Sequence, residues 1–150
     1  MTQIPRSALL LGLAGVLPFV WGALTLLSPA LGGWALDTLG GRFTGPYVQL
    51  YYGVVILAFM SGVLWGFATK ATGEQATTCY VLSVIPALWA FFMTGIGTKA
   101  SGISLIVGFL GLLMIDAAFA RWGLAPAWWM KLRVLLTTLV VACLAVSVVL

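Results

Sequence analysis

Five long apolar stretches, each of about the length that crosses a bilayer as a helix, constrain this sequence more than any other feature. The hydrocarbon core of a bilayer is about 30 Å thick, which takes about 20 helical residues. The stretches lie at about residues 7–28, 47–69, 78–97, 102–120 and 128–150. Short segments rich in glycine, proline, threonine or charge separate them, as expected of turns. The sequence therefore predicts an all-α integral membrane protein, a compact bundle of five transmembrane helices forming one domain over residues 1–150.

The composition excludes most other classes of protein. Only 7% of the 150 residues are charged, against about 25% in soluble domains, so the chain lacks the side chains to face water. Its cations stand singly, so no basic face for nucleic acid is expected. Histidine is absent, and the two cysteines, Cys79 and Cys143, have neither metal-ligand nor redox spacing. We therefore expect no catalytic, cofactor-binding or metal site, no cofactor, and a protein that is not an enzyme.

The lysines and arginines predict the orientation of the five spans. Cytoplasmic loops of membrane proteins carry an excess of these residues. Five of them fall on the side of the N-terminus, and two on the other side: Arg6, Lys70, Arg121, Lys131 and Arg133 against Arg42 and Lys99. We expect a cytoplasmic N-terminus, a periplasmic C-terminus and a location in the bacterial inner membrane.

Local signals predict a bend and an interfacial segment. Pro18 lies inside the first apolar stretch and should bend that helix. The first break is either a short helix in the outer interface, with Trp34 among the headgroups and Asp37 in water, or a plain glycine-rich loop. Trp128 and Trp129 precede Lys131 and Arg133 and are interpreted as interfacial anchors.

Small residues mark the expected helix contacts. Ala58, Gly62 and Gly66 recur every four residues along one face of the second span, a pattern that lets helix backbones approach closely in lipid. Gly108 and Gly111 offer a similar patch in the fourth span. Packing within the bundle is the favoured interpretation, and a homodimer seam is the alternative.

Asp116 is the one acid inside a predicted span. An acid at the centre of a membrane helix costs roughly 2.5–3.5 kcal/mol on insertion scales, and less towards the interface. Asp116 lies five positions before Arg121, which places the acid about 7.5 Å inside the cytoplasmic end. It therefore needs a partner or a proton.

Helix geometry narrows the choice of that partner. Residues three or four positions from Asp116 are apolar, and Arg121 at i+5 is rotated about 140° away. Because the fourth and fifth spans should form an antiparallel hairpin, Arg133 is the preferred partner, ahead of Arg6 and then Lys131. Trp65 and Tyr80, also expected near the cytoplasmic side, are candidate hydrogen-bond donors. A structural brace is favoured over a functional protonatable site.

A second polar layer is expected on the outer side. Gln49, Tyr51 and Tyr52 begin the second span, and Thr94 and Thr98 follow the third. Ordinary interfacial tyrosines are the simpler interpretation. The alternative is a small outer pocket formed by Gln49, Tyr51, Tyr52 and Trp21.

Three blocks of sequence resemble a known family. They are "IPRSALLLGLAGVLPF" at residues 4–19, "YYGVVILAFMSGVLWG" at 51–66, and the Asp116 helix followed by "PAWWMKLRVLL". In this order they resemble the family called domain of unknown function 3429, which includes transmembrane protein 69 of mitochondria. The resemblance implies a multi-pass protein of a bacterial inner membrane or its mitochondrial descendant. It implies no reaction and no catalytic residue.

Two functional hypotheses follow. The first is a non-enzymatic partner subunit or assembly factor of a membrane complex, with the bilayer and other membrane proteins, or a second copy, as partners. The alternative is a small transporter or ligand-binding membrane protein that uses Asp116 as an intramembrane protonatable site.

Overall fold

The computed structural model describes residues 3–150, and the described chain is helical with no strand. Five helical segments are long and apolar enough to cross a membrane: Arg6–Leu27, Tyr47–Ala68, Gly73–Met93, Thr98–Arg121 and Trp129–Val149. The prediction of an all-α membrane protein with five spans is thus confirmed. Its orientation is not fixed by these segments.

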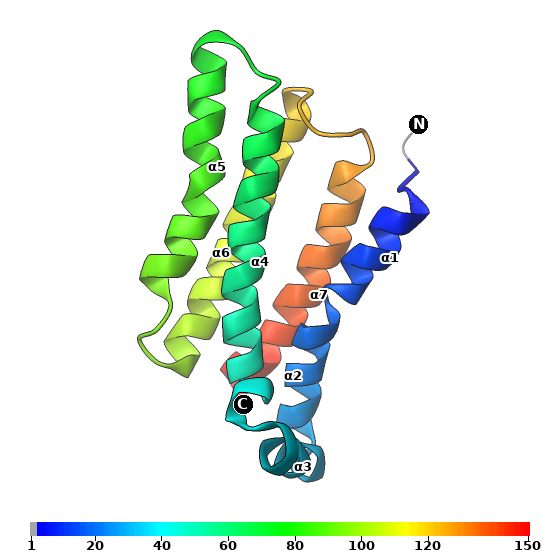
Figure 1. The fold of residues 1–150 in the computed structure, drawn as a ribbon, viewed down its shortest axis with the longest axis vertical. Coiled ribbons are helices and arrows are strands. Elements are labelled where there is room, and N and C mark those ends of the chain that lie inside the picture. The colour runs from blue at the N-terminus through cyan, green and yellow to red at the C-terminus, as the bar shows by residue number, and fades with distance from the viewer. Residues whose placement is uncertain (1–2) are drawn as a thin grey trace.

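The five spans run along the long axis of one bundle (Figure 1). Helices α4 (Tyr47–Ala68), α6 (Thr98–Arg121) and α7 (Trp129–Val149) form its centre. Helix α5 (Gly73–Met93) packs against α4 and α6, on the side away from α7. The predicted hairpin of the last two spans is present, because α6 and α7 pack closely.

The first span is broken into two helices, α1 (Arg6–Ala14) and α2 (Leu17–Leu27). Pro18 lies in the first turn of α2, where its missing N–H is tolerated, whereas a continuous helix would need that N–H. The predicted bend is therefore a break between Ala14 and Leu17, just before the proline. After the break, α2 packs against α7, α4 and α3, whereas α1 packs mainly against α7 and less closely.

A helix, α3 (Pro29–Leu39), occupies the first break, so the helical alternative holds there rather than the plain loop. The Ser28 hydroxyl accepts from the N–H of Leu31 at 3.2 Å and caps the helix. Figure 1 views α3 nearly end-on, across the direction of the spans. Trp34 and Asp37 are exposed on it, as an interfacial helix requires.

The third span is displaced from its predicted position. Helix α5 begins at Gly73 rather than near residue 78, because the polar residues of the second break continue the helix. It ends at Met93 rather than near residue 97, since Gly95 and Gly97 have φ of 106° and 123°, a region that glycine enters without steric cost.

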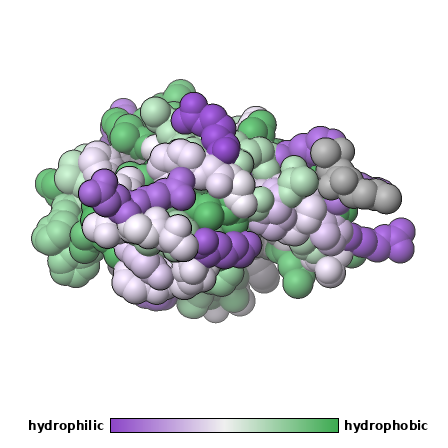
Figure 2. Space-filling model, turned by 90° about the horizontal axis from the view of Figure 1, so that it is seen from above, coloured by the Kyte–Doolittle hydropathy of each residue, from purple (hydrophilic) through white to green (hydrophobic). Residues whose placement is uncertain are grey.

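The surface is apolar around the bundle and charged at its ends. Large side chains such as Leu11, Phe59 and Phe91 are 74%, 65% and 73% exposed, which in a soluble protein would be an aggregation hazard. Figure 2 views the end that carries the N-terminus, where hydrophilic residues gather. This distribution fits a bundle whose sides contact lipid.

The predicted small-residue contacts are largely wrong. A Cβ added to Gly62, Gly66 or Gly111 would meet no atom within 4 Å, and Ala58 is exposed. These residues therefore face outward. The prediction was wrong because the spacing of small residues does not say which face of a helix is buried. Gly108 alone packs as predicted: its Cβ would lie 2.8 Å from Cδ1 of Trp89.

Candidate functional site

A buried ion pair joins α6 to α7. Nε of Arg133 donates to Oδ2 of Asp116 at 2.8 Å. Asp116 is 0% and Arg133 5% exposed, so lipid reaches neither charge to any extent. The structure thus brings together the acid and the cation that helix geometry nominated. Removing either charge would leave the other uncompensated in a medium that cannot solvate it.

Trp129 completes the hydrogen bonding of the acid. Its Nε1 donates to Oδ1 of Asp116 at 3.0 Å, and the side chain is buried. The prediction of an interfacial anchor is therefore wrong for Trp129. Trp129 and Arg133 are four residues apart on α7 and so lie on the same face of the helix. This spacing is the sequence signal that could have identified the second donor.

The other residues considered for Asp116 lie elsewhere. Arg6 is exposed at the start of α1, and Lys131 is also exposed. Trp65 and Tyr80 pack against each other, with ring centroids 4.6 Å apart. In residues 3–150, the side chains that hydrogen-bond to Asp116 are those of Arg133 and Trp129.

Two buried polar groups beside the ion pair have no hydrogen-bond partner in the described chain. They are Nη2 of Arg133 and Oγ1 of Thr137. Thr137 is 3% exposed and lies one helical turn beyond Arg133, on the same face of α7. Buried polar groups almost always have a hydrogen-bond partner, so two neighbouring buried groups without one are unusual. Thr137 is not among the predicted site residues, although its four-residue spacing from Arg133 is present in the sequence.

Arg133 and Thr137 are both among the residues that line a cavity of about 140 Å³ between α1–α2, α4, α6 and α7. Its walls are mainly apolar and include Gly12, Phe19, Ile56, Met60, Phe109 and Val140. Leu11 and Phe59 also line it and are themselves largely exposed, so the cavity opens on the side of the bundle. Gly12 in the last turn of α1 and Gly15 in the break between α1 and α2 line the cavity and present no side chain, which leaves this space open.

The predicted outer pocket does not form from its four residues. Gln49 is fully buried, and its Nε2 donates to the carbonyl oxygens of Phe19 at 2.8 Å and Cys143 at 3.1 Å. Nε1 of Trp21 donates to the carbonyl of Phe43 at 2.7 Å. Tyr51 and Tyr52 do share a small surface depression. Gln49 instead ties three helices together, a role that its position near the start of a span concealed.

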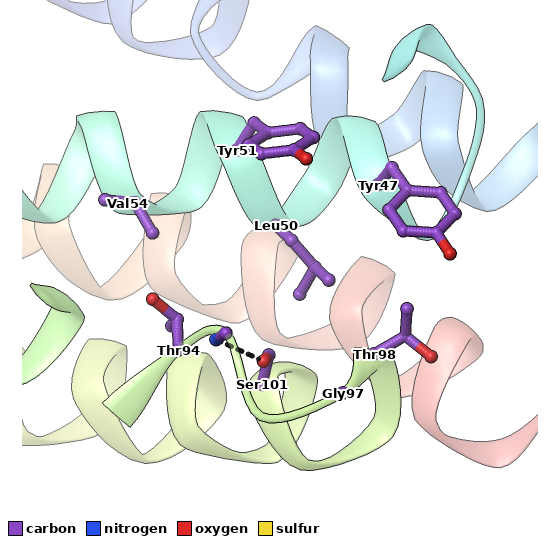
Figure 3. A pocket seen from close by; sticks show the side chains of 9 residues that line it. Tyr47, Leu50, Tyr51, Val54, Thr94, Gly97, Thr98 and Ser101 are labelled. Carbon is purple, nitrogen blue, oxygen red and sulfur yellow. Dashed lines mark hydrogen bonds between the residues drawn. The ribbon is translucent and has the colours of Figure 1, made fainter. Parts of the chain in front are cut away.

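A different outer pocket, of about 370 Å³, lies between α4 and the α5–α6 turn (Figure 3). Tyr47, Tyr51, Thr94 and Thr98 line it, so one of the four predicted residues belongs to it. Oγ of Ser101 accepts from the N–H of Gly95 at 2.9 Å (Figure 3). None of the unpartnered buried groups identified in residues 3–150 lines this pocket, so the cavity beside Arg133 is the stronger candidate site.

Comparison with known proteins places the chain in a family. Residues 4–149 match the family described as protein of unknown function (DUF3429). The chain belongs to this family. Transmembrane protein 69 of Xenopus tropicalis is 31% identical over 153 aligned residues, which cover 99% of this chain and 56% of that protein. The chain thus spans about half the length of this relative.

Membership of the DUF3429 family agrees with the resemblance seen in the sequence, and with the helical membrane fold. No solved structure matches the chain. The family description supplies no reaction.

Proposed function

We propose that this protein is a non-enzymatic membrane protein that binds a lipophilic molecule in the cavity beside Arg133. One observation carries the proposal: two residues that each hold a buried, unpartnered polar group, Arg133 and Thr137, line an apolar cavity that opens on the side of the bundle. Ligand sites are typically apolar with a few polar groups that fix orientation. A ligand entering from the bilayer would reach this cavity without crossing water.

Asp116 supports such a site without contacting the ligand. Both of its oxygens accept hydrogen bonds from α7, and it is not among the residues that line the cavity. Its role in the proposal is to hold the Arg133 side chain and neutralise its charge. This favours binding over transport coupled to protonation of Asp116, because a proton on Asp116 would leave the buried guanidinium of Arg133 without its counter-charge.

A partner subunit or assembly factor is the second candidate function, and the outer face of α4 supports it. Ala58, Gly62 and Gly66 lie exposed in a row on this helix, where a helix of another protein could approach its backbone closely. The two functions are compatible, because this row does not line the cavity.

One purification distinguishes the two functions. The protein is extracted into lipid nanodiscs without detergent, and bound small molecules and proteins are identified by mass spectrometry. We expect wild type to retain a lipophile at about one per chain and Gly12→Leu to lose it. A Cβ at Gly12 meets only side-chain carbons of Leu136 and Leu132, at 3.0 Å and beyond, so the added side chain can occupy the cavity.

Gly62→Leu is the matched control. It adds the same side chain on the open face of α4, so it should keep the lipophile and lose any partner protein that docks on that face. Equal lipophile content in wild type and Gly12→Leu would contradict the binding function. A partner that remains bound to Gly62→Leu would contradict docking on α4.

We also propose that the protein lies in the bacterial inner membrane with its N-terminus in the cytoplasm, on the evidence of the cation distribution. In a background of Cys79→Ala and Cys143→Ala, single cysteines replace exposed Thr38 in α3 and exposed Gln75 in α5. An impermeant maleimide added to spheroplasts should label Thr38→Cys at least tenfold faster than Gln75→Cys. The reverse pattern would invert the topology.

A further inference from the structure

The unpartnered polar groups of the residues that line the cavity beside Arg133 are hydrogen-bond donors. A guanidinium group donates and cannot accept, and a threonine hydroxyl can donate. Nη2 of Arg133 and Oγ1 of Thr137 both lack a partner in residues 3–150, and their two residues line the same cavity. A ligand that satisfies both groups must therefore supply an acceptor. One carbonyl oxygen, with two lone pairs, can accept from both.

The charge of the site selects among acceptors. The carboxylate of Asp116 is bonded to Arg133, so the pair is neutral overall. An anionic ligand would add one uncompensated negative charge beside a buried carboxylate, in a medium of low dielectric constant where such a charge is costly. An uncharged acceptor adds none. The ion pair therefore disfavours carboxylates and phosphates and favours neutral carbonyl compounds.

The dimensions of the cavity limit the group that enters. Its volume of about 140 Å³ is close to the roughly 150 Å³ of an engineered lysozyme cavity that binds benzene. The walls include the aromatic residues Phe19 and Phe109. A six-membered ring or a short acyl segment fits this space, and a longer tail would have to leave past Leu11 and Phe59, at the open side.

The depth of the donors fits the same ligand. Arg133 and Thr137 lie four and eight residues after the first residue of α7, or about 6 Å and 12 Å along the helix axis. The acceptor would thus lie below the headgroup layer, between the interface and the membrane centre. Lipophiles with one polar end and a hydrocarbon tail can place a carbonyl at that depth.

We infer that the cavity binds the carbonyl oxygen of an uncharged lipophile, held by Nη2 of Arg133 and Oγ1 of Thr137. The inference rests on the proposed binding function and specifies its ligand class. Two sources share this chemistry: the ring carbonyl of a quinone and the ester carbonyl of a lipid. Asp116 and Trp129 act as positioning residues, since they fix the guanidinium without lining the cavity.

The test uses protein in nanodiscs made of ether lipids, which contain no carbonyl. Four probes have the same ten-carbon tail: a benzoquinone, an alkylbenzene, a methyl ester and a carboxylate. Binding is measured by partition into loaded over empty nanodiscs, and a ¹³C-labelled carbonyl reports hydrogen bonding through its infrared stretch. We expect the quinone, the ester or both to bind more tightly than the alkylbenzene, with a carbonyl stretch shifted to lower frequency.

Thr137→Val removes the hydroxyl at nearly constant volume. It should weaken carbonyl binding by about two- to tenfold, the effect of one hydrogen bond, and reverse part of the infrared shift. Thr138→Val is the matched control, because Thr138 is exposed and its hydroxyl already donates to the carbonyl of Val134 at 2.7 Å. The control should bind as wild type does.

The outcomes separate this inference from the proposed function. If the alkylbenzene binds as well as the carbonyl probes, and Gly12→Leu abolishes all binding, the cavity binds lipophiles but the inference is overturned. Tighter binding of the carboxylate than of both carbonyl probes also overturns it. If no probe binds better to wild type than to Gly12→Leu, the proposed function itself fails. A preference for quinone or for ester identifies the source.

Discussion

Asp116→Ala is expected to destabilise the protein by about 3 kcal/mol, the largest loss among single changes at the ion pair. Breaking a buried pair typically costs 3–5 kcal/mol because the remaining charge is left uncompensated. The lower end applies because Arg133 lies four residues inside α7, close enough for a long side chain to reach towards the headgroups. The change also removes the acceptor for Nε1 of Trp129. Reversible unfolding in bicelles measures the loss.

A double-mutant cycle separates the pair from its surroundings. Asp116→Asn and Arg133→Gln should each destabilise, and the double variant should lose at least 1 kcal/mol less than the sum of the two. Arg121→Gln is the control, since Arg121 is an exposed cation on the same helix as Asp116. A double variant as damaging as the sum would show that the two charges do not stabilise each other.

An apolar replacement tests whether the pair serves only stability. Well-packed apolar residues in place of a buried ion pair are often neutral or stabilising, and lipid on the outside strengthens this expectation. Asp116→Leu with Arg133→Met should therefore recover most of the stability lost in Asp116→Ala. If the pair also positions a donor for a ligand, the same variant will fail to retain the lipophile.

The ion pair could be predicted from the sequence because two constraints act together. An acid in lipid must be satisfied, and the short connection between α6 and α7 leaves few partners at the same depth. The pairing of Asp116 with Arg133 follows from those constraints. The four-residue spacing places Trp129 on the same face of α7 as Arg133, but this signal does not decide between a donor and an interfacial anchor, because an aromatic residue next to cations fits the interface equally well.

The directions of side chains were less predictable than the helices that carry them. In a membrane helix the buried and lipid-facing sides are both apolar, so hydrophobic periodicity says little about which face packs inward. Gly62, Gly66 and Gly111 proved to face outward for this reason. Gln49 proved to be buried, and its hydrogen bonds to backbone carbonyls of two other helices satisfy its amide N–H groups there. No sequence pattern indicated these contacts.

Phe19→Ala is expected to cost about 2–4 kcal/mol, although the surrounding medium is lipid. Phe19 is fully buried, and its ring packs edge-on against Tyr52 at 5.3 Å and Phe109 at 5.8 Å between centroids. Phenylalanine truncation in soluble cores costs about 3–5 kcal/mol through lost transfer energy and a new cavity. In lipid the transfer part is small, whereas the lost packing remains, which lowers the expected value without removing it.

Phe92→Ala is the matched control for this packing argument. Phe92 is 67% exposed on α5 and contacts the ring of Phe91, so its truncation exchanges mainly lipid contacts. Its cost should stay below about 1 kcal/mol, measured by the same unfolding experiment. Equal losses for the two changes would mean that burial in the bundle is worth no more than contact with lipid. The larger loss at Phe19 would instead show that close packing among α2, α4 and α6 holds the wall of the cavity in place.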